Sequence, residues 1–361
     1  MPDRRPQRLE ALTQAILEAH LDALLLTSLP NIRYITGFSG TSALALVTTK
    51  DATLITDFRY QTPASAEVGD LARVVIEPQS LWTGLWRTLP GGSPTVIGFE
   101  SHHLVHRDFQ RLIEHGVRVQ WRPTLDMVEV LREQKDEDEV ALITHAARSA
   151  DRALELTVGE IHGGMTELEI AGALERALRD CGSEGFPFPT IVASGERSAL
   201  PHARSSERAV QPGDFLLIDF GAVVGGYCAD VTRTFVLGRA TDEQREIHSI
   251  VREANERASR AIRAGMRGRD ADAVARGYIE DRGFGDAFGH SLGHGIGIEV
   301  HEAPRLARTA ESSLPRHAVV TIEPGIYRPG WGGVRIEDDV FLGDEGARVL
   351  TAFSRDLIEI G

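Results

Sequence analysis

The sequence has few cysteines, no long apolar run and fewer basic than acidic residues. Its two cysteines, Cys181 and Cys228, follow no pairing pattern, which argues against a disulfide-based scaffold and indicates a reducing compartment. No apolar segment approaches membrane-spanning length, and the N-terminus lacks the apolar core of a signal peptide. A net charge of −14 argues against a surface for nucleic acid or acidic lipid. We therefore expect a cytoplasmic protein that binds neither nucleic acid nor membrane.

The composition is that of a globular protein long enough for two domains. The chain has 361 residues, of which 42% are hydrophobic and 25% charged. Apolar residues at helical spacing from Leu9 to Leu21, a hairpin pattern over 42–57 and a strand pattern at 117–121 predict a small α/β domain. A charged break follows at 134–139. We therefore predict domains at 1–130 and 131–361.

The second part of the chain repeats one order of patterns. A long amphipathic helix is predicted near 138–158 and another near 242–264, and each leads to a Gly-Met pair and a second helix. A β-hairpin pattern closes each half. The repeat of roughly 100 residues predicts a pseudo-twofold fold in which each half supplies two acidic side chains.

The first of these hairpins carries Asp219 and Asp230. Asp219 ends an apolar run, Asp230 opens a β-prone run, and Gly225-Gly226 lies between them. A two-residue turn at Val224-Gly225 would place the two carboxylates directly opposite each other on one face. In that register their Cβ atoms would lie roughly 5 Å apart.

The second hairpin carries Glu323 and Glu337, which a loop centred on Gly330 would bring opposite each other. Any one of these acids, taken alone, is best interpreted as a strand-end charge that faces water. Four converging carboxylates, however, are tolerable only with cations between them. The mirrored spacing of the four acids therefore favours a pair of divalent metal ions, and carboxylates with one imidazole suit Mn, Zn, Co or Fe(II).

Four of the thirteen histidines are candidates for the site. The glycine-rich stretch 288–302 disfavours a helix, so the metal-binding spacing of helical zinc motifs does not apply there. Within it, His294 is flanked by glycines and is the predicted nitrogen ligand. His290 and His301 are expected nearby, where they could donate protons to a carbonyl oxygen or to a substrate carboxylate. His202 lies in a turn-rich stretch before the first hairpin, a usual position for a catalytic side chain.

The motifs resemble those of the pita-bread metallopeptidases, in the branch of Xaa-Pro aminopeptidase and Xaa-Pro dipeptidase (prolidase). The matching strings are LIDFG at 217–221, ADVTRT at 229–234, HSLGHG at 290–295, TIEPG at 321–325 and VRIE at 334–337. The resemblance implies an α+β fold: a pita-bread (creatinase-like) catalytic domain with a pseudo-twofold internal repeat, preceded by a smaller α/β domain. The extra domain argues against the methionine aminopeptidase branch, and the metal-binding acids argue against creatinase.

The resemblance also implies a ligand set for two divalent ions per chain, with Mn²⁺ expected and Zn²⁺ or Co²⁺ possible. Asp219 would bind one ion, His294 and Glu323 the other, and Asp230 and Glu337 would bridge them. The pair of ions would activate a water molecule for attack on the scissile carbonyl.

Further roles follow from the same resemblance. Glu323 would also accept a proton and pass it to the leaving proline nitrogen. His202 and His301 would steady the substrate and the developing oxyanion, with His290 close to the substrate. Arg335 would orient the bridging acids from behind. Members of the family form homo-oligomers, so a dimer or tetramer is expected.

The expected activity is that of an Xaa-Pro aminopeptidase, which releases an N-terminal residue before proline from peptides longer than two residues. An Xaa-Pro dipeptidase is the alternative. The segment 39–43 offers small side chains and no group to bind a carboxylate, which favours the longer substrate. A non-catalytic binding protein on the same fold is a third hypothesis, against which the intact ligand set argues.

Overall fold

The chain divides into two compact units. The computed structural model describes residues 3–89, 95–116 and 118–361, and the units are Met1–Arg132 and Glu133–Gly361. The predicted division between residues 130 and 131 lies close to this point and stays a prediction. Within the described part of the chain, no helix is both long and apolar enough to cross a membrane.

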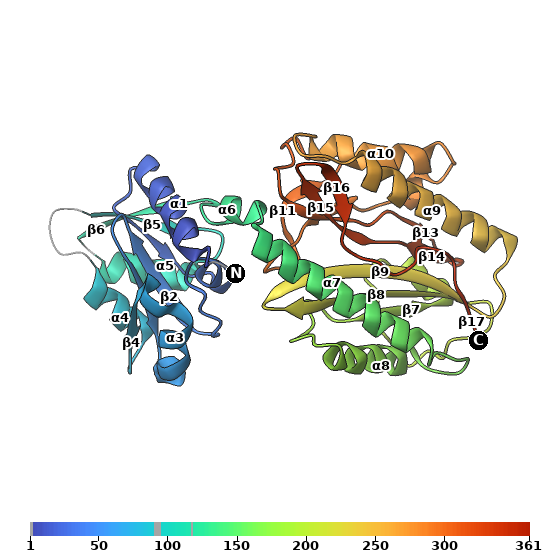
Figure 1. The fold of residues 1–361 in the computed structure, drawn as a ribbon, viewed down its shortest axis with the longest axis horizontal. Coiled ribbons are helices and arrows are strands. Elements are labelled where there is room, and N and C mark those ends of the chain that lie inside the picture. Colours follow the sequence, from blue (N-terminus) through green and yellow to red (C-terminus); the bar gives the residue numbers. More distant parts are fainter. Residues whose placement is uncertain (1–2, 90–94, 117) are drawn as a thin grey trace. The chain divides into compact units, whose positions relative to one another are not determined.

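The first unit is a mixed six-stranded sheet with helices around it (Figure 1). Its strands are β1 (Ala23–Leu26), β2 (Ala43–Thr48), β3 (Ala52–Thr56), β4 (Arg73–Ile76), β5 (Thr95–Glu100) and β6 (Val119–Thr124). Its helices are α1 (Arg5–Glu18), α2 (Leu29–Thr36), α3 (Gln61–Val68), α4 (Leu81–Thr88) and α5 (His106–His115), with 3₁₀ segments at Phe58–Tyr60 and Gly69–Leu71; α6 (Glu129–Glu133) lies at the junction. The strand order is β4-β3-β2-β1-β5-β6.

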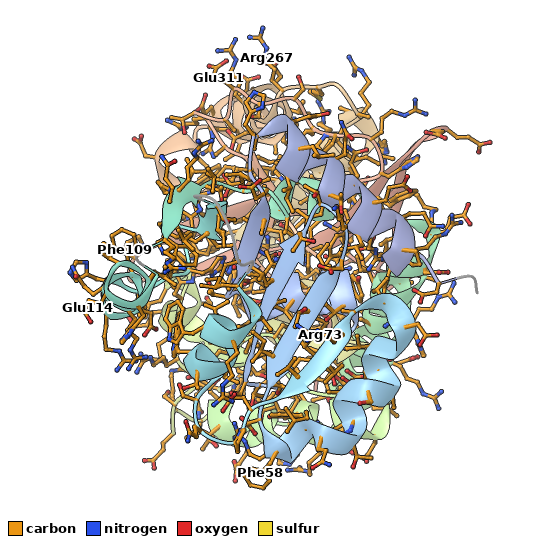
Figure 2. All side chains as sticks on the ribbon, turned by 90° about the vertical axis from the view of Figure 1, so that its left-hand side faces the viewer. Phe58, Arg73, Phe109, Glu114, Arg267 and Glu311 are labelled. Atoms are coloured by element: carbon orange, nitrogen blue, oxygen red, sulfur yellow. The ribbon has the colours of Figure 1, made fainter. Side chains whose placement is uncertain are left out.

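Local sequence explains this sheet. The fully apolar β1 is buried because it pairs with β2 on one side and β5 on the other. The predicted hairpin over 42–57 is confirmed, since β2 and β3 pair antiparallel. The predicted strand at 117–121 is seen as β6, although Val117 itself lies outside the described residues. Figure 2 shows Phe58, the most exposed large apolar side chain among those described, at the surface of this unit.

The second unit contains two halves. The first half consists of α7 (Glu137–Val158), α8 (Glu167–Asp180), β7 (Ile191–Ser194), β8 (Phe215–Val224) and β9 (Tyr227–Leu237), with a 3₁₀ segment at Gly195–Ala199. The second half consists of α9 (Asp242–Ala261), α10 (Gly268–Glu280), a 3₁₀ segment at Gly285–Ala287, β10 (Gly293–Gly295), β11 (Glu302–Leu306), β12 (Val319–Ile322), β13 (Gly325–Arg328), β14 (Gly332–Arg335), β15 (Asp338–Gly343), β16 (Gly346–Val349) and β17 (Glu359–Ile360).

The halves repeat one plan, a pair of helices followed by antiparallel strands, except that the last strand, β17, returns to pair in parallel with β9. The sheet orders are β17-β9-β8-β7 and β11-β10-β12-β15-β16, with β13 and β14 as a separate ribbon. One apolar core lies between the first helix pair and its strands, and a second lies between α9, α10 and the strands of the other half. Figure 1 shows the strands of this unit between the two helix pairs, so the centre of the unit is formed by β-structure.

Helix α9 covers the strands of the second half. Its N-terminus is closed by Thr241, which forms a capping box with Gln244. Ile247, Val251 and Ala254 recur at intervals of three and four residues and are buried. The same stripe turns the polar Asn255 inward, where none of it is exposed to solvent.

The turn of the first hairpin lies one residue beyond its predicted position, which shifts the predicted strand register by two residues. The turn is formed by Gly225-Gly226, both with positive φ, and not by Val224-Gly225. The turn prediction was wrong because it placed a β-branched valine where a left-handed conformation is required. As a result Asp219 pairs with Thr232, and Asp230 lies two residues before Thr232 on β9, opposite Gly221. The two acids therefore share one face as diagonal neighbours rather than directly opposed residues.

Candidate metal centre

The second pair of acids lies at an interruption of its hairpin. Ile322 pairs with Asp338 on one side of the interruption and Gly325 pairs with Arg335 on the other, so the same register runs through both ladders. Glu323 and Glu337 stand between these ladders, and the predicted register around Gly330 is confirmed. Pro324 contributes to the break because it has no N–H to donate to a ladder. The backbone N–H of Glu323 instead donates to Leu292 O at 2.8 Å.

Thr232 joins the two hairpins. The backbone N–H of Glu337 donates to Thr232 O at 3.1 Å, and the Thr232 hydroxyl donates to Glu337 Oε2 at 2.6 Å. Because Thr232 is paired with Asp219 and lies two residues from Asp230, it brings Glu337 to the face that carries both aspartates. Sequence analysis did not single out Thr232, although its position two residues after Asp230 on a strand places both on one face.

His294 faces the acids from β10. Its Nε2 lies 3.9 Å from Asp230 Oδ2 and 3.6 Å from Glu323 Oε1. Its Nδ1 lies 3.0 Å from Gly295 O, and a carbonyl oxygen can only accept, so Nδ1 carries the proton. The unprotonated Nε2 is thereby directed at the carboxylates, as a metal-binding imidazole requires.

The glycines beside His294 allow the strands to approach closely. A Cβ on Gly293 would lie 2.0 Å from Thr321 O, and one on Gly295 would lie 2.1 Å from Ala303 O. No side chain fits at these distances, so β10 can lie against β11 and β12 only with glycine at both positions.

The electrostatics of the cluster favour a bound cation. Burial raises the pKa of Asp230 and of Glu323 well above their usual range, and it raises the pKa of Glu337 to about 8. Burial also lowers the pKa of His294 to about 4, so the imidazole is neutral. Without a cation, the Glu337 carboxyl group would be largely protonated at neutral pH.

The donor atoms also fit a metal. Ligand atoms of Asp230, His294 and Glu337 all lie within 4.8 Å of one another. Oδ1 of Asp219 and Oδ1 of Asp230 are buried and have no hydrogen-bond partner among the described residues. Carboxylate oxygens with one imidazole nitrogen form a donor set suited to Mn²⁺, Zn²⁺ or Co²⁺.

Arg335 lies behind the acids. Its Nη2 donates to Asp219 Oδ2, and its Nε donates to the Thr232 hydroxyl at 3.2 Å. Its Nη1 donates to the Tyr327 hydroxyl at 2.7 Å. The guanidinium therefore contacts an acid of the first hairpin from the second hairpin, in the arrangement expected of a residue that orients ligands.

His290 is engaged with protein groups at both nitrogens. Its Nδ1–H donates to Ser291 O at 2.8 Å, and its Nε2 accepts from the Tyr327 hydroxyl at 2.9 Å. Burial lowers its pKa to about 4. Tyr327, which sequence analysis did not identify, thus connects His290 to Arg335. Contact of His290 with substrate stays a prediction.

His301 and His202 are more open to solvent. The His301 ring lies 4.5 Å from the His294 ring, centroid to centroid, and burial lowers its pKa. His202 is exposed in a turn, and the carbonyl of its neighbour Pro201 accepts from Arg335 Nη1 at 3.3 Å. The positive charge of His202 is among the causes that lower the pKa of His301. Both side chains therefore border the cluster at its accessible edge.

Arg305 is a further residue that sequence analysis missed. It is exposed on β11 and pairs directly with His294 in the β10–β11 ladder. Its positive charge is among the causes that lower the pKa of His294 and of His301, after burial. Within the described residues its guanidinium has no ion-pair partner. The Arg305 guanidinium is therefore a positively charged group without an ion-pair partner among the described residues, next to His294.

Comparison with known proteins gives matches over both units. Residues 141–344 match the model of metallopeptidase family M24, and residues 8–134 match the creatinase/prolidase N-terminal domain. These matches and the solved structures confirm the predicted α+β, pita-bread fold with its smaller N-terminal α/β domain.

Several full-length proteins resemble the chain. The structure of an Xaa-Pro dipeptidase from Bacillus anthracis superposes with a TM-score of 0.94 at 40% identity, covering 99% of this chain and 100% of that one. An X-Pro aminopeptidase structure from Thermotoga maritima gives a TM-score of 0.88 at 40% identity, covering 98% and 99%. An Xaa-Pro dipeptidase of Pyrococcus furiosus is 36% identical over 357 residues, which cover 98% of this chain and 99% of that protein.

Proposed function

Because this chain belongs to metallopeptidase family M24, we propose that it hydrolyses the bond between an N-terminal residue and a following proline in dipeptides. The metal dependence of the proposed reaction rests on one observation: ligand atoms of Asp230, His294 and Glu337 lie within 4.8 Å of one another. The dipeptidases of Bacillus anthracis and Pyrococcus furiosus, similar over nearly their whole length, favour a dipeptide substrate. This reverses the expectation of an aminopeptidase.

The proposed ligand set is the predicted one. Asp219 would hold one divalent cation, His294 and Glu323 the other, and Asp230 and Glu337 both. Cations held in this way polarise a carbonyl group and lower the pKa of a water molecule toward neutrality. The raised carboxylate pKa values and the buried oxygens without partners support this assignment.

The remaining residues act on the substrate or hold the ligands. Glu323 has an 18% exposed side chain at the edge of the cluster, a position from which it can take a proton and pass it to the leaving nitrogen. His301 and His202, at the accessible edge, are placed to donate hydrogen bonds to the substrate carbonyl. Arg335 holds Asp219 in place, and we assign His290 to positioning Arg335 through Tyr327, with the substrate contact as a second role.

Arg305 offers a basis for dipeptide selection. In an Xaa-Pro dipeptide the free carboxylate belongs to the proline, directly after the scissile bond. In a longer peptide that position is a neutral amide. A guanidinium paired across the ladder with His294 is suited to bind this carboxylate. Segment 39–43 lies in the first unit, whereas Arg305 lies on β11 of the second.

The test compares an Xaa-Pro dipeptide with an Xaa-Pro-Xaa tripeptide, with added Mn²⁺ and with chelator. We expect metal-dependent cleavage of the dipeptide and far slower cleavage of the tripeptide. Arg305→Ala should raise the dipeptide KM about 10–100-fold, because it removes one hydrogen bond between charged groups. Arg308→Ala is the matched control, because Arg308 is also exposed but pairs with Glu280 at 3.1 Å.

The alternatives have distinct outcomes. Preferred cleavage of the tripeptide would support the aminopeptidase, which the Thermotoga maritima structure keeps as the second candidate. Absence of cleavage with every divalent ion would support the non-catalytic binding protein. We further propose, from the sequence resemblance, that Mn²⁺ is the ion used, that the protein acts in the cytoplasm, and that it forms a dimer or tetramer.

A further inference from the structure

Asn255 connects α9 to both strands of the second hairpin. Its Nδ2 donates to Ile322 O at 2.8 Å and to Ile336 O at 3.2 Å. Both partners are carbonyl oxygens, so only the amide nitrogen can face them. Ile322 and Ile336 directly precede Glu323 and Glu337 in the sequence. A single buried amide therefore links the two backbones one residue before each acid.

The hydrogen bonds of Asn255 lie where the backbone pairing of the second hairpin is interrupted. The interruption lies between the pair Ile322 with Asp338 and the pair Gly325 with Arg335. Across it, the backbone bond is a long one, from Ile336 N–H to Pro324 O at 3.4 Å. The separation of the two strands at the acids is therefore set in part by a side chain from α9.

The environment of Asn255 indicates that the amide is retained for these bonds. The residue is fully buried, and its Oδ1 has no hydrogen-bond partner within the described residues. A buried polar atom without a partner is unfavourable, so an apolar side chain would pack better at this position. The two N–H bonds are the compensating interactions that an apolar residue could not make.

We propose that Asn255 is a positioning residue, which holds Glu323 and Glu337 at the separation that the divalent cations need. This inference rests on the proposed metal centre. Asn255 contacts neither substrate nor metal and acts through the backbones of Ile322 and Ile336. Loss of a group that orients ligands typically weakens metal affinity 10–100-fold.

The experiment titrates metal-stripped full-length protein with Mn²⁺ by calorimetry and then measures kcat and KM for an Xaa-Pro dipeptide. Asn255→Asp keeps the shape of the side chain but removes both N–H donors. We expect its Mn²⁺ affinity to be about 10–100-fold weaker than that of the wild type. Its kcat at subsaturating Mn²⁺ should fall with little change in KM. Asn255→Ala, which adds no charge, is the second variant and should behave alike.

Ser259→Ala is the matched control. Ser259 lies one turn further along α9, is buried, and its hydroxyl has no hydrogen-bond partner within the described residues. This variant should keep wild-type Mn²⁺ affinity, so a loss specific to the Asn255 variants supports the proposal.

Three outcomes would overturn the inference. A folded Asn255 variant with wild-type Mn²⁺ affinity would reduce the role of the amide to fold stability, even if the variant melts earlier. Failure of both variants to fold would assign Asn255 to the core instead. If the wild type itself binds no Mn²⁺, Zn²⁺ or Co²⁺, the proposed function fails first and the positioning role fails with it.

Discussion

The two hairpins that supply the acids reach the same place by different means. The pairing of β8 with β9 is continuous from Phe215 with Val236 to Val224 with Tyr227, and its acids lie inside the strands. The second hairpin is interrupted where its acids lie. A continuous ladder positions its side chains through its own register, whereas the interrupted one depends on contacts from elsewhere.

Those outside contacts come from three directions. Thr232 binds Glu337 from the first hairpin, Leu292 O accepts from the backbone of Glu323, and Asn255 binds both strands from α9. Equal chemistry in the two halves therefore does not require equal backbone geometry. We expect the second hairpin to be the more sensitive to substitutions at a distance.

The variants with the largest expected effect test whether the acids of the two halves have equivalent roles. Asp230→Ala and Glu337→Ala should each lower kcat/KM by about 10³-fold or more, because a bound divalent ion contributes several kcal/mol to the transition state. The double variant should lose little beyond either single one, since the acids act as a unit. Peptidase assays with added Mn²⁺ measure this.

The control for these variants is Glu345→Ala, an exposed acid between β15 and β16 that should keep full activity. Near-normal activity in only one of the two alanine variants would break the equivalence of the hairpins and remove that acid from the bridging role.

An intermediate effect concerns the stability of metal-free protein. The pKa of Glu337 is raised to about 8 by burial, above its value in the unfolded chain. Such a group stabilises the fold fully only below its unfolded pKa, and this contribution is lost as pH rises through the folded value. Chelated protein should therefore melt at least about 2–4 °C lower at about pH 9 than at about pH 5, the shift that corresponds to about 1 kcal/mol.

Thermal unfolding with and without Mn²⁺ measures this dependence, and Mn²⁺ should reverse its direction because metal binding favours the ionised acids. The Glu337→Gln variant cannot ionise at this position and therefore tests whether Glu337 is the group responsible. If the metal-free pH dependence keeps its full size in this variant, its source is the other buried carboxyl groups with raised pKa, which are Asp230, Glu323 and Asp339.

The smallest expected effect is on stability, and it distinguishes the turns of the two hairpins. Gly225 has φ +57°, and a Cβ there would lie 2.8 Å from Leu142 Cδ2, whereas Gly330 has φ +75° and open space around it. Gly330→Ala should lower the free energy of unfolding by about 1 kcal/mol, and Gly225→Ala by about 1–2 kcal/mol, since Leu142 must also move. Urea unfolding measures both.

Gly277→Ala in α10 is the control for the turn variants. Its surroundings are open and its φ is ordinary, so alanine should raise stability by about 0.5–1 kcal/mol. Equal losses at Gly225 and Gly330 would show that the contact with Leu142 contributes nothing.

Much of the candidate site could be predicted because its residues lie in short strings with local meaning. Strand runs that end or begin in an acid indicated Asp219 and Asp230, and a loop centred on Gly330 gave the register that faces Glu323 with Glu337. The predicted turn of the first hairpin was wrong by one residue, since a pair of glycines allows two adjacent turn positions and only backbone conformation selects between them.

Residues that act across the repeat could not be predicted in this way. Thr232, Asn255 and Arg305 have ordinary local contexts, and each gains its role from a partner on another element. The hydrogen bond from Thr232 to Glu337, for example, joins positions 105 residues apart.

The sequence by itself determined the repeat of helices and hairpins, because apolar periodicity and turn glycines act over a few neighbouring residues. It also determined which oxygen and nitrogen donors are available. Tertiary structure alone decided how these donors meet, since burial, shifted pKa values and hydrogen bonds between the halves exist only once the two cores have packed. Local patterns specify each strand, but the distance between acids on different strands is a property of the whole unit.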